Sequence, residues 1–243
     1  MAKKKIGGIE EQRKLFIEGA KFITRAAKAY CDERLEVLGI DPSTNSTGTA
    51  FHKKSGEIVT GVIASSTYGF SRYIKIEKVI RELLEDSFPF VAVEGYAHNA
   101  KWGREIAGEL GGIIRRILYF KKRPLILVAP LVIKSWVRAK GKDQIMLEIL
   151  DRYGIKISNS DAADAFVIQD VVYRAVLLAK DVIKNKLKDP NEVKAYLKNE
   201  EYKTVIGLNK LFKYQQTSLF RLIISQGPNC EFFLKEKPLL YAK

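Results

Sequence analysis

The sequence predicts an α/β domain built on a mixed five-stranded sheet that is flanked by helices. Three short segments of β character, at 35–40, 48–52 and 57–63, follow one another along the chain, as in an antiparallel meander. Apolar runs at 88–94 and 125–128 then alternate with segments of helical periodicity, which is typical of buried parallel strands joined by helices.

Helices are predicted where apolar residues recur at three- and four-residue spacing. Within the α/β domain they cover 71–86, 99–120, 131–138, 143–152 and 158 to about 187. The second of these helices carries four glycines, each of which costs about 1 kcal/mol relative to alanine in a helix interior. We therefore expect another backbone to approach closely there. The sheet beneath the helix is the favoured neighbour, and a second subunit is the alternative; the glycines are Gly103, Gly108, Gly111 and Gly112.

Three parts are expected along the chain. Residues 1–34 form a basic extension with a helix from about residue 10 to residue 30, and residues 35–187 form the α/β domain. Asp189-Pro190 breaks the last long helix, and 188–243 follow as an extension without an assignable fold. In this extension we expect helices at 191–198 and 208–224 and a strand at 231–234. Basic and aromatic residues interleave at Lys210, Phe212, Lys213 and Tyr214, which suits contacts with single-stranded DNA or a junction, although ordinary amphipathic packing is favoured.

The composition favours a nucleic-acid partner. The 243 residues include 42 Lys and Arg against 28 Asp and Glu, which gives a net charge of +14. Such an excess favours a polyanionic partner, nucleic acid ahead of membrane, over a basic protein with no such partner. The two cysteines, Cys31 and Cys230, form no zinc motif with histidine. No apolar run is long enough to span a bilayer, so we expect no membrane partner.

Four acidic residues stand where the predicted elements should converge. Asp41 and Glu94 each end an apolar strand, and Asp is a poor strand residue; a turn cap explains Asp41 equally well. Asp161 and Asp164 lie three residues apart, so they share one face of the first turn of a helix. The alternative is that these acids favour the helix dipole, with Ser160 or Asp161 as the N-cap.

Converging carboxylates would require cations, because like charges repel and raise one another's pKa. Two Mg²⁺ ions would relieve this repulsion, activate a water and stabilise a leaving oxygen during phosphodiester hydrolysis. Oxygen ligands favour Mg²⁺, with Mn²⁺ as its substitute, over softer metals.

Four sets of residues occur in a fixed order along the domain. They are Gly-Ile-Asp-Pro-Ser-Thr-Asn-Ser-Thr-Gly (39–48), Val-Ala-Val-Glu (91–94), Ala-Pro-Leu-Val-Ile-Lys (129–134) with Gly-Lys-Asp-Gln-Ile (141–145), and Asp-Ala-Ala-Asp-Ala (161–165). Over roughly residues 35–182 this order resembles the motifs of RuvC-type Holliday junction resolvases, a family with the RNase H-like fold.

The resemblance implies that an acidic tetrad holds the metal ions: Asp41, Glu94, Asp161 and Asp164. It implies that Lys134 and Lys142 hold the scissile phosphate or the junction backbone, with Lys142 counted among the catalytic residues. The basic elbow Arg138-Ala-Lys-Gly-Lys142 adds Arg138 and Lys140 to the expected DNA-binding residues. The family's stacking aromatic has two candidates here, Tyr96 and Trp102. A homodimer is also implied, with its subunit contact on the helix at 99–120, and no nucleotide cofactor.

Three departures from the family stand out. More than thirty residues precede the first strand, the tail after Leu187 is longer than in bacterial members, and Ser43 replaces a usual glycine. The two extensions resemble divergent phage, viral or organellar relatives. We expect the cytoplasm of a bacterial or phage-infected cell, ahead of an organelle.

The expected function is a divalent-metal-dependent endonuclease that cuts four-way junctions and other branched DNA. One alternative is another RNase H-like nuclease, acting on RNA:DNA hybrids or as a transposase-type enzyme. A second alternative is a non-catalytic junction-binding protein, which would have no use for four converging acids. An actin-like or sugar-kinase-like ATPase is disfavoured, because the sequence shows no second phosphate hairpin.

Overall fold

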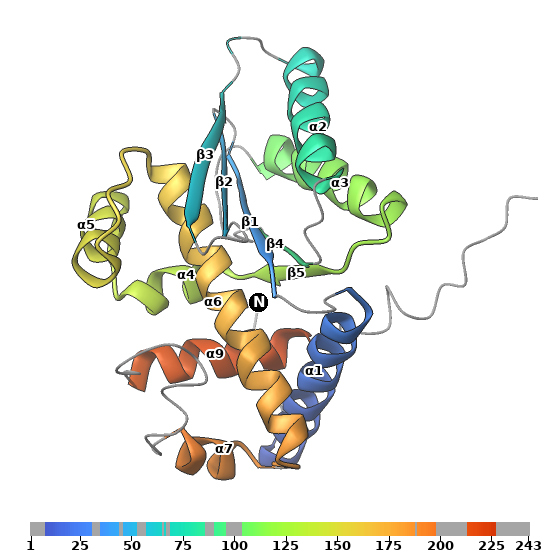
Figure 1. Ribbon diagram of the computed structural model, residues 1–243, viewed down its shortest axis with the longest axis vertical. Helices are drawn as coiled ribbons and strands as arrows, with labels where there is room; N and C mark the ends of the chain where they lie inside the picture. Colours follow the sequence, from blue (N-terminus) through green and yellow to red (C-terminus); the bar gives the residue numbers. More distant parts are fainter. Residues whose placement is uncertain are drawn as a thin grey trace, which may run out of the picture.

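A mixed sheet of five strands lies at the centre of the structure (Figure 1). The computed structural model describes residues 8–30, 35–43, 46–52, 57–64, 66, 69–85, 90–95, 104–187, 189–197 and 213–226. The strands are β1 (Val37–Pro42), β2 (Ser46–His52), β3 (Ile58–Ala64), β4 (Phe90–Glu94) and β5 (Leu125–Val128), in the order β3-β2-β1-β4-β5. β1, β2 and β3 pair antiparallel, whereas β4 runs parallel to β1 and β5 parallel to β4. The predicted fold class, a mixed five-stranded sheet flanked by helices with an N-terminal helix and a helical C-terminal extension, is confirmed.

Helices cover both faces of this sheet. On one face lie α2 (Phe70–Glu85) and α3 (Arg104–Phe120), and the other is crossed by the long helix α6 (Ser160–Lys184). α4 (Pro130–Val137) and α5 (Lys142–Tyr153) lie on the α6 side. The extensions add α1 (Ile9–Tyr30), α7 (Pro190–Tyr196) and α9 (Lys213–Gln226), which lie along the part of α6 that continues beyond the sheet (Figure 1).

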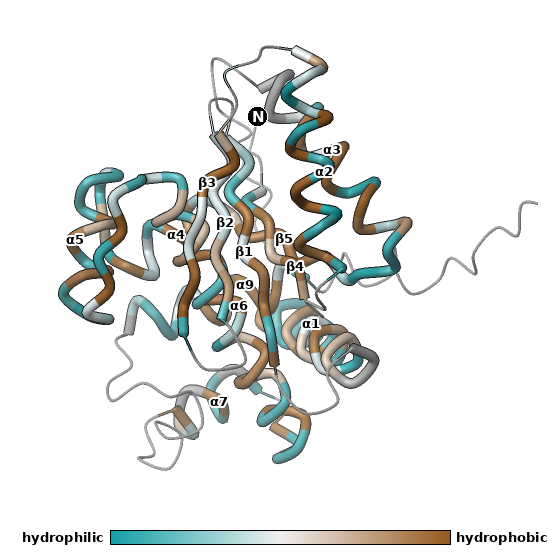
Figure 2. Tube along the Cα trace, turned by 45° about the horizontal axis from the view of Figure 1, so that its top comes forward, coloured by the Kyte–Doolittle hydropathy of each residue, from teal (hydrophilic) through white to brown (hydrophobic). Residues whose placement is uncertain are grey.

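The central strands are apolar on both faces, as strands between two helical layers must be. Successive side chains of β1 alternate: Val37 packs in the core on the α6 side, whereas Leu38 and Ile40 pack against α2 and α3. β1 and β4 are accordingly mostly brown in Figure 2. This alternation also directs the odd-numbered residues of β1, including Asp41, toward α6.

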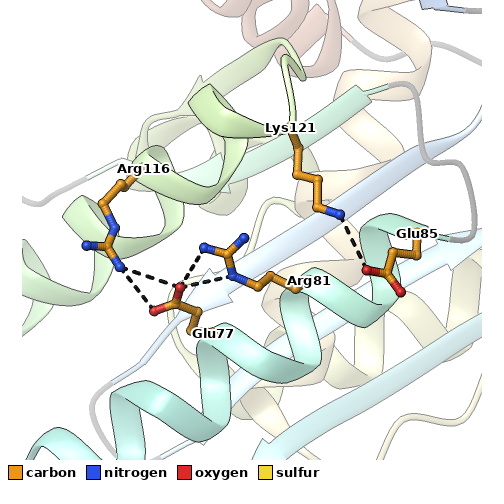
Figure 3. A network of polar contacts seen from close by, with 5 residues as sticks. All are labelled: Glu77, Arg81, Glu85, Arg116 and Lys121. Atoms are coloured by element: carbon orange, nitrogen blue, oxygen red, sulfur yellow. Dashed lines mark hydrogen bonds and ion pairs between the residues drawn. The ribbon is translucent and has the colours of Figure 1, made fainter. Parts of the chain in front are cut away.

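Ion pairs at the surface join α2 to α3 (Figure 3). Glu77 accepts hydrogen bonds from Arg81 on its own helix, at 2.7 and 2.9 Å, and lies 3.4 Å from Arg116 on α3. Lys121 and Glu85 form a second link at 3.4 Å. Exposed pairs of this kind contribute about 0–1 kcal/mol each, so the apolar contact beneath them supplies most of the stability of this layer.

Two glycines of α3, Gly108 and Gly112, do not make room for the sheet. A Cβ atom added at Gly108 or Gly112 would meet no atom of the described part of the chain within 4 Å. The favoured prediction, that the sheet beneath explains these glycines, is therefore wrong at these two positions, because they lie on the side of α3 that faces away from it.

The two extensions pack against each other. The ring centroids of Phe16 in α1 and Phe220 in α9 lie 5.2 Å apart, and a Cβ at Gly19 would overlap the backbone carbonyl of Ile223. Arg13 pairs with Asp189, the N-cap of α7. The strand predicted at 231–234 lies outside the residues described. None of the described helices has the length and apolar character needed to cross a membrane.

Candidate active site

The two acids that end strands lie side by side on the α6 face of the sheet. Ile40 of β1 pairs with Val93 of β4 in parallel register, so Asp41 and Glu94 occupy the next pair of positions. Asp41 is 4% exposed. Burial, together with the neighbouring Glu94 carboxyl group, raises the pKa of Asp41.

The first turn of α6 supplies the other two acids. The N-cap is Asn159, whose side-chain oxygen accepts hydrogen bonds from the backbone N–H groups of Asp161 and Ala162 at 2.8 and 3.0 Å. The alternative in which Ser160 or Asp161 caps this helix is therefore wrong. Because neither acid has to cap the helix, the carboxyl groups of Asp161 and Asp164 are available to the site.

Two glycines allow α6 to approach the strands closely enough for the four acids to meet. A Cβ at Gly48 in β2 would overlap the backbone carbonyl of Asp161, and a Cβ at Gly39 in β1 would overlap that of Ala165. Any larger residue at these positions would move the first turns of α6 away from Asp41. Both glycines lie in the motif at 39–48, but their contact with α6 was not predicted.

Burial and the charges of neighbouring acids shift the pKa values of Asp41, Glu94 and Asp164 upward. Burial is the largest cause for Asp41, and its neighbours Glu94 and Asp161 add to it. Burial likewise raises the pKa of Glu94. For Asp164, burial together with the charge of Asp41 raises the pKa to about 6. The site therefore concentrates negative charge that its surroundings do not balance.

Lys142 reaches these acids from the first turn of α5. Its ammonium group donates a hydrogen bond to Asp161 at 2.8 Å and lies 3.9 Å from Asp164. Burial lowers the pKa of Lys142, but the hydrogen bond to Asp161 and the nearby acidic charges outweigh it, so the net pKa is raised. Lys134 of α4 lies at the edge of the same site, since its charge opposes the burial that raises the pKa of Glu94 and Asp164.

Two residues that were not predicted also shape this end of the sheet. Ser46, at the start of β2, donates its hydroxyl to Asp161. Arg72, in the first turn of α2, is 9% exposed and donates to the backbone carbonyl of Ser43 at 2.9 Å, in the turn that follows Asp41. Ser46 lies within the motif at 39–48, which was a usable signal, whereas nothing in the sequence around Arg72 marks it.

The other predicted DNA-binding residues lie on the elbow between α4 and α5 or outside the described residues. Lys140 is exposed on the elbow, where its backbone N–H donates to Gln144 at 2.8 Å. Arg138 ends α4 in a left-handed conformation, with φ of 58°, and its guanidinium carbon lies 5.9 Å from the ring centroid of Tyr214 in α9. Tyr96 and Trp102 fall outside the residues that the structure describes.

The carboxylate oxygens of the four acids are suitable ligands for hard divalent cations. Mg²⁺ and Mn²⁺ prefer carboxylate oxygens, and four carboxyl groups meet here on two strands and a helix. Among the residues described, no three or more His, Cys, Asp and Glu side chains stand at the spacing of a preformed metal site. Instead, burial raises the pKa of both Asp41 and Glu94, and Lys142 pairs with Asp161. Metal binding would therefore release a proton.

Comparisons with known proteins gave similarity to RuvC structures. The Thermus thermophilus RuvC structure is 20% identical, with a TM-score of 0.47, over 58% of this chain and 93% of that chain. T. thermophilus RuvC in complex with Holliday junction substrate is 21% identical, with the same TM-score, over 56% of this chain and 91% of that chain. No family model and no curated protein matches the chain.

Proposed function

We propose that this protein is a divalent-metal-dependent endonuclease that hydrolyses phosphodiesters in four-way junctions and other branched DNA. The observation that carries this proposal is the meeting of four acids around Lys142 at one end of the sheet: Asp41, Glu94, Asp161 and Asp164. The net charge of +14 supports a polyanionic substrate.

The four carboxyl groups would hold two metal ions, Mg²⁺ or Mn²⁺. When bound, such ions supply an activated water and stabilise the leaving oxygen of a phosphodiester. The protein's own contribution is to fix the carboxyl oxygens on the ends of β1 and β4 and on the first turn of α6. Lys142 carries a positive charge at the acids, where it binds and neutralises the phosphate under attack.

The basic residues outside the tetrad would position the DNA backbone. Lys134, Lys140 and Arg138 lie on α4 and the elbow that leads to Lys142. Contacts of lysine and arginine with phosphate fix register and orientation without reading bases. Selectivity for branched DNA would then come from the shape of the junction.

A symmetric homodimer completes the proposal, because cutting opposed strands of a junction requires two copies of the site. The face of α3 around Gly112 supports it. This glycine is exposed, and a Cβ there would meet no described atom within 4 Å. A second copy of α3 could approach this face closely, at the helical segment where the subunit contact is expected.

The test is cleavage of a synthetic four-way junction beside matched duplex, flap and RNA:DNA hybrid, with Mg²⁺, Mn²⁺ or EDTA. We expect paired nicks across the junction with either metal and none with EDTA. The Asp41→Asn variant is the control for a contaminating nuclease.

Two other outcomes would replace the proposal. Cutting of the hybrid alone would keep the acids as a catalytic site but assign them to a ribonuclease H activity. Tight junction binding without any cutting would assign the chain to the non-catalytic junction-binding class.

A further inference from the structure

We propose that α9, in the C-terminal extension, braces the elbow between α4 and α5, with Tyr214 as a positioning residue that keeps Lys142 at the acids. This inference depends on the proposed function only in taking the Lys142 site as the active site. It gives the extension a role in the site itself.

Two arginines, one before and one after Lys142 in the sequence, lie over the ring of Tyr214. The guanidinium carbons of Arg138 and Arg152 lie 5.9 and 5.7 Å from the ring centroid of Tyr214. Both distances are within the range of cation–π attraction. Arg138 ends α4 just before the elbow, and Arg152 lies in the last turn of α5, the helix that begins with Lys142.

Arg152 also secures the end of α4. It donates to the backbone carbonyls of Trp136 and Val137 at 3.3 and 3.0 Å, and it pairs with Glu148 at 2.6 Å. These carbonyls would otherwise lack partners at a helix C-terminus. Arg152 therefore links the end of α4 to α5, and the Tyr214 ring sets where this link lies.

α9 can serve as a brace because its last two turns are anchored to β5 and α1. At its far end the side-chain amide of Gln226 donates to the backbone carbonyl of Leu127 in β5 at 3.1 Å. One turn earlier Ile223 lies in backbone contact with Gly19 of α1, and nearer the middle of α9 Phe220 packs against Phe16 of α1. The first turn of α9, which carries Tyr214, is thus fixed relative to β5. In the sheet β5 is the neighbour of β4, the strand that ends with the acid Glu94.

The amides of the elbow provide a readout that needs no substrate. The backbone N–H of Ala139 donates to the backbone carbonyl of Lys134 at 3.0 Å, and the backbone N–H of Lys140 donates to the side-chain oxygen of Gln144 at 2.8 Å. Loss of the brace should open these two bonds more often and speed their hydrogen exchange.

The experiment compares the full-length wild type with Tyr214→Leu and Tyr214→Phe, the latter keeping the ring. In Tyr214→Leu we expect exchange at residues 138–142 to become roughly tenfold faster, with the first turn of α6 unchanged. Single-turnover junction cleavage should fall by roughly ten- to a hundredfold, while junction affinity stays within about twofold. Tyr214→Phe should behave like the wild type in all three measurements.

A double-mutant cycle then tests whether Tyr214 acts through Lys142. In a Lys142→Ala background, Tyr214→Leu should lower cleavage by less than about twofold further, because residues acting through one group are not additive. Full additivity would overturn the proposal. So would unchanged elbow exchange in Tyr214→Leu, or equal defects in the Leu and Phe variants.

Arg138→Gln gives a second route if Tyr214→Leu unfolds α9. This change leaves the packing of α9 intact, and faster exchange confined to the elbow would support the brace, whereas unchanged exchange would overturn it. Because exchange is measured without DNA, a wild-type protein that cuts no branched DNA would refute the proposed function and leave the brace to be judged by exchange alone.

Discussion

Asp41→Asn is expected to abolish cleavage while junction binding survives. The substitution keeps the size of the buried side chain but removes a charged oxygen from the metal-binding set, so a hydrolysis rate at background level is expected with affinity within about threefold. Cleavage assays and gel-shift titrations with the same junction provide the two measurements. An equal loss of both would remove Asp41 from its proposed role as a metal ligand.

Lys142→Ala should lower turnover and flatten the salt dependence of binding. Its ammonium group lies 2.8 Å from Asp161, so it would contact the phosphate at the acids, and each lost phosphate contact reduces the slope of log K against log salt by about one. Titrations at several salt concentrations measure this slope. Lys78→Ala is the matched control, since Lys78 is exposed and lies 3.9 Å from Glu82 on α2. An enzyme unchanged by Lys142→Ala would contradict the assignment.

His52 should make the folded state less stable as the pH falls. Burial lowers the pKa of His52 below its ordinary 6.5, and its ring nitrogen lies 2.7 Å from the Gln169 amide nitrogen. The unfolded chain therefore binds the proton first, and the stability contributed by neutral His52 is present above pH 6.5 and lost as the pH falls through that value.

Urea unfolding of the wild type and His52→Gln between about pH 5 and 8 tests this prediction. Asp164 titrates in the same window with the opposite sign, because its raised pKa of about 6 favours the folded state at lower pH. That effect is common to both proteins, so their difference isolates His52. The advantage of the wild type should shrink below pH 6.5; a constant difference would contradict the prediction.

Among the elements, the contact between α6 and the sheet predicts a strong effect of Gly48→Ala. The added methyl group would displace the first turn of α6, so we expect a loss of about 1–3 kcal/mol of stability and a larger proportional loss of cleavage. Gly8→Ala is the matched control, because Gly8 lies just before α1, outside the site, and its added methyl group would meet no described atom within 4 Å; it should change stability by less than about 1 kcal/mol. A fully active Gly48→Ala variant would show that α6 can move without disturbing the acids.

Most of the elements could be predicted from the sequence, because the periods of strands and helices are local. The segment predicted at 125–128 is β5, and α6 begins at Ser160, two residues after the predicted start, because Asn159 caps it. The tetrad could be placed because each acid ends a predictable strand or opens a predictable helix. The contacts that bring distant segments together could not be predicted from the sequence. The pairs Gly48 with Asp161 and Tyr214 with Arg138 join positions far apart in the chain and leave no local pattern.

For the whole molecule, Mg²⁺ should raise the unfolding temperature, and more so at higher pH. Burial raises the pKa of Asp164 to about 6, and the stability that it contributes in its neutral form is lost as the pH rises through that value. At higher pH the carboxyl groups are ionised and repel one another, and metal ions relieve this repulsion without first having to displace protons from them. At a hundred times its dissociation constant, a bound ion stabilises by about 2.7 kcal/mol, or roughly 5–10 °C for a chain of this size.

Calorimetry with Mg²⁺ or EDTA, at about pH 6 and pH 8.5, measures this effect. The shift produced by Mg²⁺ should be larger at the higher pH and nearly absent in Asp41→Asn. An undiminished shift in that variant would place the bound metal elsewhere in the protein.

The pairing of α1 with α9 has a consequence for how the chain is made. A ribosome adds about 5–20 residues per second, so α1 leaves it on the order of ten seconds or more before α9. All five strands and α6 are synthesised between the two. The acids can therefore be assembled while one side of α1 is still bare, including Phe16 and Gly19, which later meet α9. During synthesis α1 is therefore made well before α9, the last helix in the described part of the chain, and the apolar side of α1 is the surface that a chaperone would have to cover.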